Sequence, residues 1–335
     1  MNGSAVAIKR VTQESFNHAN NHLDNSFGQV LRGVMLELEI ITAVKHRCIC
    51  PFYGVLAFFN PEHDLQLGLV FELCDANLYN VLHEPEGPSS HARTLTPEQR
   101  LTIATDVASG LEYLHSLSIL HRDLSSRNIL LKQHCSRAYI ADYGCARKIY
   151  SSEGYSSTTI SGSPPYMPPE QLTGNLLHLQ SDVYAFGVLL WEIVVNAVPL
   201  SELRNDILAI RARVVGEQGK LPKVSPRSDM PQAAAACGVL IEKATSFCEK
   251  DRPPMTSIYQ ALVTIREGTW EEDSWDHSKA ALEQLLTNFY AHHNPTMMSS
   301  AASVSKEYWT NEEALNKRLF ARYKTDLRDF AGGSA

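Results

Sequence analysis

The chain of 335 residues lacks three features that mark common classes of protein: closely paired cysteines, a long apolar run and an excess of basic side chains. Its seven cysteines are an odd number and form no C-x-x-C pair, which argues against a zinc site or a disulfide framework. Such cysteine usage favours a reducing compartment, the cytosol or the nucleus, and the cytoplasm is the predicted location. The start, MNGSAVAIKR, has no basic stretch followed by an apolar core, so no secretory signal is expected.

Charge and hydrophobic runs exclude two further classes. With 30 basic against 37 acidic residues the formal net charge is −7, so no nucleic-acid partner is expected. The apolar run at 186–191 ends at Glu192, far short of the ~20 residues that span a bilayer, and no membrane segment is expected. Apolar residues at 44% and charged residues at 20% are typical of a globular protein, and the length indicates two domains or one two-lobed unit.

Hydrophobic patterning predicts a small mixed unit over residues 1–73. Alternating β-branched residues predict a strand at 5–9, and apolar residues in helical register predict a helix over 34–44. Two more strands are expected at 52–59 and 65–73.

Residues 74–268 predict a mainly helical unit. Thr96 is expected to cap a helix that begins at Pro97 and runs to Leu117. Short buried strands are expected at 119–120, 129–131 and 139–141, and helices at 181–195, 203–215, 232–248 and 255–266.

The tail, 269–335, begins with an acidic linker and continues with two helical patterns. The first carries Leu282, Leu285, Leu286 and Phe289 and ends before Pro295; the second begins at a capping box of Thr310 and Glu313 and carries Leu315, Leu319, Tyr323 and Leu327. The pattern predicts a helical hairpin extension that docks a partner. A strap packed on the main unit is the alternative.

Two short segments carry the chemistry. Residues 121–128 read HRDLSSRN, and residues 142–144 read DYG, each beside a predicted buried strand. Phosphoryl transfer needs a carboxylate near the incoming hydroxyl and oxygen-bearing side chains that hold Mg²⁺ against the phosphates. Asp123, Asn128 and Asp142 supply that set, and an ion pair of Lys9 with Glu37 could hold the lysine toward the phosphates.

In this order the motifs resemble those of the eukaryotic protein kinases, over residues 6 to about 267. They are VAIK at 6–9, Glu37, HRDLSSRN, DYG, GSPPYMPPE at 162–170, SDVYAFG at 181–187 and DRPPM at 251–255. The resemblance implies an α+β, bilobal fold with a small, truncated β-rich N-lobe, a helical C-lobe and the helical extension. It also implies ATP and Mg²⁺ as cofactors and proteins as substrates.

The resemblance also implies roles for single residues. Asp123 is expected to be the catalytic base, Asn128 and Asp142 the Mg²⁺ ligands, and Lys9 the phosphate anchor with Glu37 as its partner. The nucleotide is expected to contact Ala7, Lys9, Phe71, Glu72, Cys74 and Leu130. Arg122 is expected to bind a phosphate on Thr158 or Thr159. Structural roles fall to His121, Tyr143, Glu170, Asp182 and Arg252.

The sequence departs from the family pattern at its start. Only five residues precede Val6, too few for the glycine-rich loop that covers the ATP phosphates in this family. Two explanations stay open: the chain begins at an internal Met of a longer protein, or it is a headless variant that acts as a pseudokinase scaffold. Tyr143 and Pro168 also replace the usual Phe and Ala, without removing a reacting group.

The motifs give mixed indications of whether the acceptor hydroxyl belongs to Ser, Thr or Tyr. Position 125 is Ser where serine/threonine kinases usually carry Lys, and Arg127 resembles the tyrosine-kinase loop. Residues 162–167, however, resemble the serine/threonine pattern. This mixture is typical of the tyrosine-kinase-like group, so Ser/Thr is the predicted acceptor, with tyrosine or dual specificity as the alternative.

Overall fold

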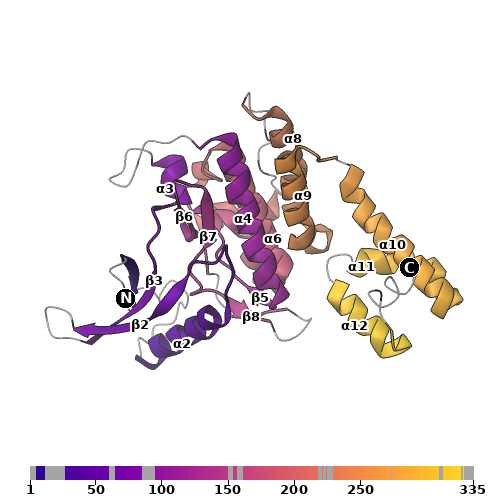
Figure 1. The fold of residues 1–335 in the computed structure, drawn as a ribbon, viewed down its shortest axis with the longest axis horizontal. Helices are drawn as coiled ribbons and strands as arrows, with labels where there is room; N and C mark the ends of the chain where they lie inside the picture. The colour runs from indigo at the N-terminus through magenta and orange to yellow at the C-terminus, as the bar shows by residue number, and fades with distance from the viewer. Residues whose placement is uncertain are drawn as a thin grey trace.

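The structure is a computed structural model. It describes residues 5–11, 27–59, 65–84, 95–149, 154–156, 161–217, 221, 224, 229–271, 273–308, 312–325 and 327. Figure 1 shows two lobes and, beyond them, a separate group of helices at the C-terminal end.

The N-lobe is an antiparallel sheet with one long helix against it. Its strands are β1 (Val6–Arg10), β2 (Phe52–Phe59) and β3 (Leu65–Glu72), in the order β1-β3-β2. The β1–β3 register places Lys9 opposite Leu69, which is buried. The sheet thereby holds Lys9 at a defined place on the lobe.

Helix α2 (Phe27–Ala43) starts earlier than the sequence indicated. The expected start at Val34 was wrong, because Phe27, Val30 and Leu31 continue the same helical spacing toward the N-terminus. Gly28 and Gly33 interrupt that pattern, and glycine is a poor helix former, which obscured the first two turns.

The C-lobe is mainly helical. Its helices are α3 (Leu78–His83), α4 (Pro97–Ser116), α5 (Pro169–Thr173), α6 (Leu179–Val195), α7 (Ile207–Arg211), α8 (Pro231–Ala244) and α9 (Met255–Glu267). Its strands are β4 (Ala76–Asn77), β5 (Ile119–Leu120), β6 (Ile129–Lys132), β7 (Arg137–Ile140) and β8 (Arg147–Lys148). Strands β4, β6 and β7 form one small sheet, and β5 pairs with β8.

Two helices show how the sequence determines this lobe. At the start of α4, the Thr96 hydroxyl accepts a bond from the Gln99 N–H at 3.2 Å, and the Gln99 side chain accepts from the Thr96 N–H at 2.9 Å. This reciprocal cap confirms the expected start at Pro97. Helix α6 is buried on all sides from Ser181 to Val194, so it forms the centre of the lobe's core.

Two expected helices of the C-lobe are shorter in the structure. The helix predicted over 203–215 is broken, because Arg204 and Asn205 have left-handed φ angles of 48° and 60°. The chain forms a 3₁₀ turn (Ser201–Leu203), then α7, then a wider turn (Ala212–Gly216). The helix predicted to reach 248 ends at Ala244. Both the N–H and the hydroxyl of the next residue, Thr245, donate to the Ile241 carbonyl.

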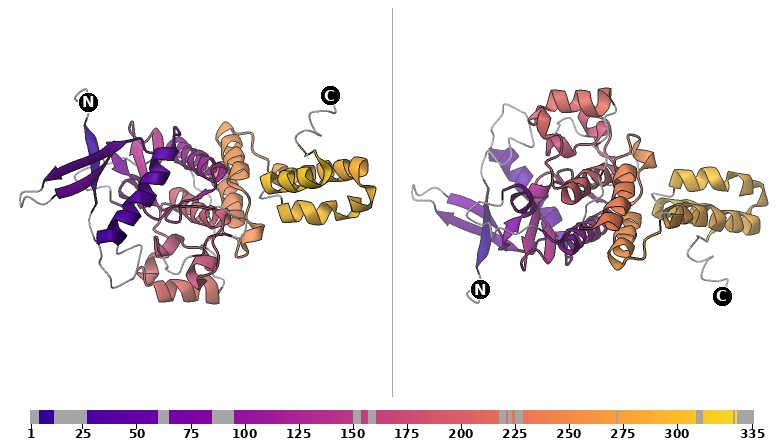
Figure 2. Two further views of the ribbon diagram at one scale, coloured as in Figure 1. Left: turned by 90° about the horizontal axis from the view of Figure 1, so that it is seen from below. Right: turned by 90° about the horizontal axis from the view of Figure 1, so that it is seen from above.

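The C-terminal extension contains α10 (Asp273–His293), a 3₁₀ turn (Pro295–Ser300), α11 (Ala301–Tyr308) and α12 (Glu312–Tyr323). Among its described residues this unit has a further helix, α11, beyond the two of the expected hairpin, and Val304 of α11 is buried in the unit's core. Its own core comprises Leu286, Phe289, Tyr290, Ala301, Val304, Leu315, Leu319 and Leu327. Both views in Figure 2 place it beside the lobes, beyond α9. Thr310 of the expected capping box lies outside the described residues.

Candidate active site

Lys9 on β1 reaches two carboxylates from distant parts of the chain. Its Nζ atom is 2.7 Å from Glu37 Oε1 on α2 and 2.8 Å from Asp142 Oδ1 on the loop after β7. Glu37 is buried, whereas the side chain of Asp142 is 44% exposed and that of Lys9 is 34% exposed. Lys9 therefore joins the two lobes at a place that remains open to solvent.

Lys9, Glu37 and Asp142 form a cluster in which opposite charges stabilise one another. Burial would lower the pKa of the Lys9 ammonium, but the carboxylates of Asp142 and Glu37 outweigh that effect and hold the pKa above its usual value. Burial would raise the pKa of Asp142, but the charge and hydrogen bond of Lys9 hold that pKa below its usual value. Lysine and carboxylate are thus both charged at neutral pH.

The Asp142-Tyr143-Gly144 turn points the carboxylate of Asp142 outward. Asp142 has a left-handed φ of 64°, and its Oδ1 accepts a bond from the Gly144 N–H at 3.2 Å. Tyr143 is buried; its hydroxyl donates to the Ile140 carbonyl at 3.3 Å, and its ring meets the His121 ring edge-on at 5.5 Å. The buried tyrosine therefore has the polar partner that its hydroxyl requires.

The loop that carries Asp123 is held from beneath by Asp182 of α6. One carboxylate oxygen of Asp182 accepts the His121 N–H at 2.8 Å, and the other accepts the Arg122 N–H at 2.9 Å. The His115 ring lies 3.1 Å from the same carboxylate. Burial would raise the pKa of Asp182, but the hydrogen bonds and charges of His115 and His121 together outweigh burial and hold the pKa below its usual value. Asp182 is thus a charged anchor inside the core.

Asp123 is held in a defined orientation by two neighbours. Its Oδ1 accepts bonds from the Ser163 N–H at 2.8 Å and the Ser163 hydroxyl at 2.7 Å, and its Oδ2 accepts from the Asn128 amide at 3.0 Å. Burial raises the pKa of Asp123 above its usual value, although the Ser163 hydroxyl bonds to the charged form and opposes the change. A carboxylate with a raised pKa is suited to accept a proton.

Asn128 and Asp142 have the donor atoms that a hard cation needs. The Asn128 amide nitrogen donates to both the carbonyl and the carboxylate of Asp123, so its oxygen is the atom left to act as a ligand. Asp142 adds a carboxylate that is partly exposed. Oxygen ligands of this kind fit Mg²⁺.

The residues expected at the nucleotide come from both lobes. Ala7 lies opposite Phe71 across β1 and β3, and Phe71 is buried. The Glu72 side chain forms an ion pair with Lys132, and the half-buried Leu130 lies opposite Tyr139 on β7. The Cys74 thiol is 3.8 Å from the Glu72 carbonyl.

Arg122 is almost fully buried and faces the segment that follows Gly144. Its Nη2 atom donates to the Ser161 hydroxyl at 2.9 Å, and its Nη1 atom donates to the Cys145 carbonyl at 3.2 Å. Thr158 and Thr159, the expected phosphorylation sites, lie outside the described residues. Their role with Arg122 stays a prediction.

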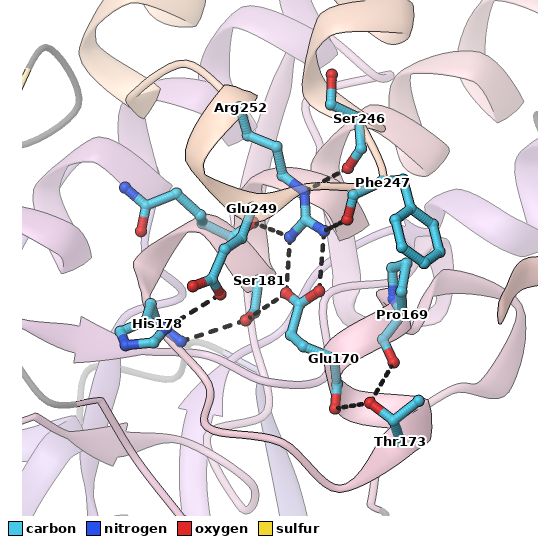
Figure 3. A network of polar contacts seen from close by, with 10 residues as sticks. Pro169, Glu170, Thr173, His178, Ser181, Ser246, Phe247, Glu249 and Arg252 are labelled. Carbon is cyan, nitrogen blue, oxygen red and sulfur yellow. Dashed lines mark hydrogen bonds and ion pairs between the residues drawn. The ribbon is translucent and has the colours of Figure 1, made fainter. Parts of the chain in front are cut away.

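A buried ion pair in the C-lobe joins Arg252 to Glu170 of α5 (Figure 3). Arg252 donates to both carboxylate oxygens of Glu170, at 2.6 and 2.8 Å. Its three remaining N–H groups donate to the carbonyls of Gln180, Ser246 and Phe247. The Ser181 hydroxyl adds a bond to Glu170 at 2.8 Å. All five donors of this fully buried guanidinium thus have an acceptor.

The sequence did not reveal two polar neighbours of the site. Ser163 belongs to the 162–167 motif, which gives it no role of its own, yet its hydroxyl contacts Asp123 directly. Glu192, buried in α6, accepts from Ser126 at 2.8 Å and from Tyr166 at 2.6 Å. A glutamate within an otherwise apolar helix was the available signal, because buried carboxylates require polar partners.

The bilobal fold, with the Lys9–Glu37 pair above and Asp123, Asn128 and Asp142 below, defines a domain of the protein-kinase class. Comparison with known families agrees: the model of the protein tyrosine and serine/threonine kinases matches residues 2–262. The chain therefore belongs to this family, and the α+β fold implied by the motifs is confirmed.

Two curated relatives from Arabidopsis thaliana have names of the receptor-kinase type. Wall-associated receptor kinase-like 18 of Arabidopsis thaliana is 32% identical over 255 residues, which cover 72% of this chain and 31% of that protein. A probable receptor-like serine/threonine-protein kinase of the same plant is 31% identical over 272 residues, which cover 78% of this chain and 58% of that protein. The matched chain spans about a third of the first relative's length. Among the residues described here, no helix is long and apolar enough to cross a membrane.

Proposed function

We propose that this chain is a serine/threonine protein kinase domain that transfers the γ-phosphoryl group of Mg·ATP to hydroxyls of protein substrates. The observation that carries the proposal is the convergence of Lys9, Asp142 and Glu37 from two lobes beside an oriented Asp123. Similarity to a relative described as a serine/threonine kinase supports the acceptor type.

The contacts of each residue support the role that we assign to it. Asp123, with its orientation set by Ser163 and Asn128, accepts the proton of the incoming hydroxyl. Lys9, held by Glu37, binds phosphate oxygens. Asn128 and Asp142 would hold Mg²⁺ through oxygen atoms. Bound Mg·ATP supplies the phosphoryl group and a cation that neutralises its charge.

The direct test is transfer of labelled phosphate from γ-labelled ATP to peptides that carry Ser, Thr or Tyr. The wild-type chain is expected to label Ser or Thr. Asp123→Asn keeps the size of the side chain but removes the base, so its rate should be about 10²–10⁴-fold lower. Phosphotyrosine as the sole product would overturn the acceptor type, and equal rates in the two proteins would overturn the mechanism.

We assign the domain to the cytoplasm, where its nucleotide substrate is present. None of the seven cysteines, all of which lie in the described ranges, forms a disulfide, which supports a reducing compartment. We assign the C-terminal extension to partner docking, supported by Phe320, which is 51% exposed on α12 beside the exposed Lys317.

A further inference from the structure

Tyr155 lies in the segment between Gly144 and Glu170 and is anchored there by its backbone. Its N–H donates to the Leu177 carbonyl at 2.7 Å, and its carbonyl accepts the Leu177 N–H at 2.9 Å. The preceding residue, Gly154, has a φ of 85°, and a Cβ there would lie 2.6 Å from the His178 ring. The chain therefore reaches Tyr155 along a path that only glycine permits.

The Tyr155 ring covers the guanidinium of Arg122. The Cζ atom of Arg122 is 4.8 Å from the ring centroid, within the range of a cation–π contact. Arg122 is only 8% exposed, and such contacts are stronger when the cation is removed from water. The ring thus contributes to stabilising a buried charge that also bonds to Ser161 and to the Cys145 carbonyl.

A short path of contacts leads from this ring to Asp123. Arg122 immediately precedes Asp123 and donates to the Ser161 hydroxyl. Two residues further on, Ser163 donates twice to the Asp123 carboxylate. The intervening Gly162 has a φ of 115°, and a Cβ there would lie 2.7 Å from the Arg122 carbonyl. The 161–163 segment is therefore pressed against both Arg122 and Asp123.

We propose that Tyr155 is a positioning residue for phosphoryl transfer: its ring holds Arg122, and through Ser161 and Ser163 it keeps Asp123 oriented. Tyr155 does not contact Asp123 itself, so its effect passes through the 161–163 segment. The inference rests on the proposed kinase function. The role of Tyr155 differs from the expected role of Thr158 and Thr159, because it depends on the aromatic ring and not on an added phosphate.

The test compares peptide phosphorylation by the full chain with Tyr155→Phe and Tyr155→Leu. Tyr155→Leu removes the ring face and should lower kcat roughly five- to thirtyfold, with KM for ATP nearly unchanged. Tyr155→Phe keeps the ring and should retain wild-type kcat. Tyr259→Leu, on α9, is the matched control for loss of a half-buried tyrosine and should leave kcat unchanged.

An unchanged kcat in Tyr155→Leu, or an equal loss in Tyr155→Phe, would overturn the inference while the kinase proposal stood. A wild-type chain that labels no peptide would instead overturn the proposed function.

A double-mutant cycle measures the contact without catalysis. The unfolding free energies of Tyr155→Leu, Arg122→Gln and the double variant should be non-additive, because both single changes remove the same interaction. Strict additivity would show that the ring and the guanidinium are not coupled, which would overturn the path from Tyr155 to Asp123.

Discussion

Two clusters in this molecule each pair a basic side chain with a carboxylate. One cluster is buried and the other is partly exposed. Arg252 and Glu170 are buried in the C-lobe, and protein acceptors occupy every N–H of the guanidinium. Lys9 and Asp142 lie between the lobes with about a third or more of each side chain exposed. The first cluster is complete without a ligand, whereas the second leaves charged atoms accessible. We therefore expect the first cluster to stabilise the fold and the second to bind the anion and the cation of the proposed nucleotide site.

The buried cluster should respond most strongly to mutation. Arg252→Leu leaves the Glu170 carboxylate buried without its cation, so the free energy of unfolding should fall by about 3–5 kcal/mol. Urea denaturation measures this change. Arg266→Leu, at an exposed position of α9, is the control and should stay within about 0.5 kcal/mol of wild type. An equal loss of unfolding free energy in the two variants would contradict the structural role of the Arg252–Glu170 pair.

The open cluster should show the opposite response. Asp142→Asn keeps an oxygen that can accept from Lys9 and Gly144 but removes the charge. The rate of phosphoryl transfer should fall by about 10²–10³-fold, as for loss of an electrostatic stabiliser. The unfolding free energy should change by less than about 1 kcal/mol, because the side chain is partly exposed. A large loss of stability would make Asp142 a second structural anchor.

The pH profile of kcat tests how Ser163 acts on Asp123. The Ser163 hydroxyl favours the ionised carboxylate, so Ser163→Ala should raise the pKa of Asp123 further above its usual value. The base must be ionised to accept a proton. The acid limb of the kcat profile should therefore lie at a higher pH in Ser163→Ala than in the wild type. Ser163→Thr retains the hydroxyl, so its acid limb should lie at the wild-type pH. An acid limb that does not move in Ser163→Ala would contradict this role.

The extension should show the smallest effect. Phe320→Ser changes an exposed side chain of α12 that is far from both clusters, so the unfolding free energy should stay within about 0.5 kcal/mol of wild type. Peptide phosphorylation should also be unchanged. Loss of catalysis in this variant would show that the extension acts on the lobes.

The sequence predicted those parts of the molecule that depend on local signals. The start of α4 follows from Thr96 and Pro97, and the strands around Asp123 follow from short apolar runs. Tertiary contacts were not predictable in this way. Ser163 meets Asp123 across 40 residues of chain, and nothing in its neighbours in sequence specifies that contact. The exposed Arg204 that breaks the predicted helix over 203–215 has a left-handed φ of 48°, which no hydrophobic pattern in the sequence indicates.

The most direct test of the account is the stabilisation of the chain by Mg·ATP. If the open cluster is a nucleotide site, the unfolding free energy should rise by about 2.7 kcal/mol at a ligand concentration of about 100 times Kd. Asp142→Asn should show a much smaller rise under the same conditions. No stabilisation of the wild-type chain at millimolar Mg·ATP would contradict the account and would favour a scaffold that binds proteins but not nucleotide.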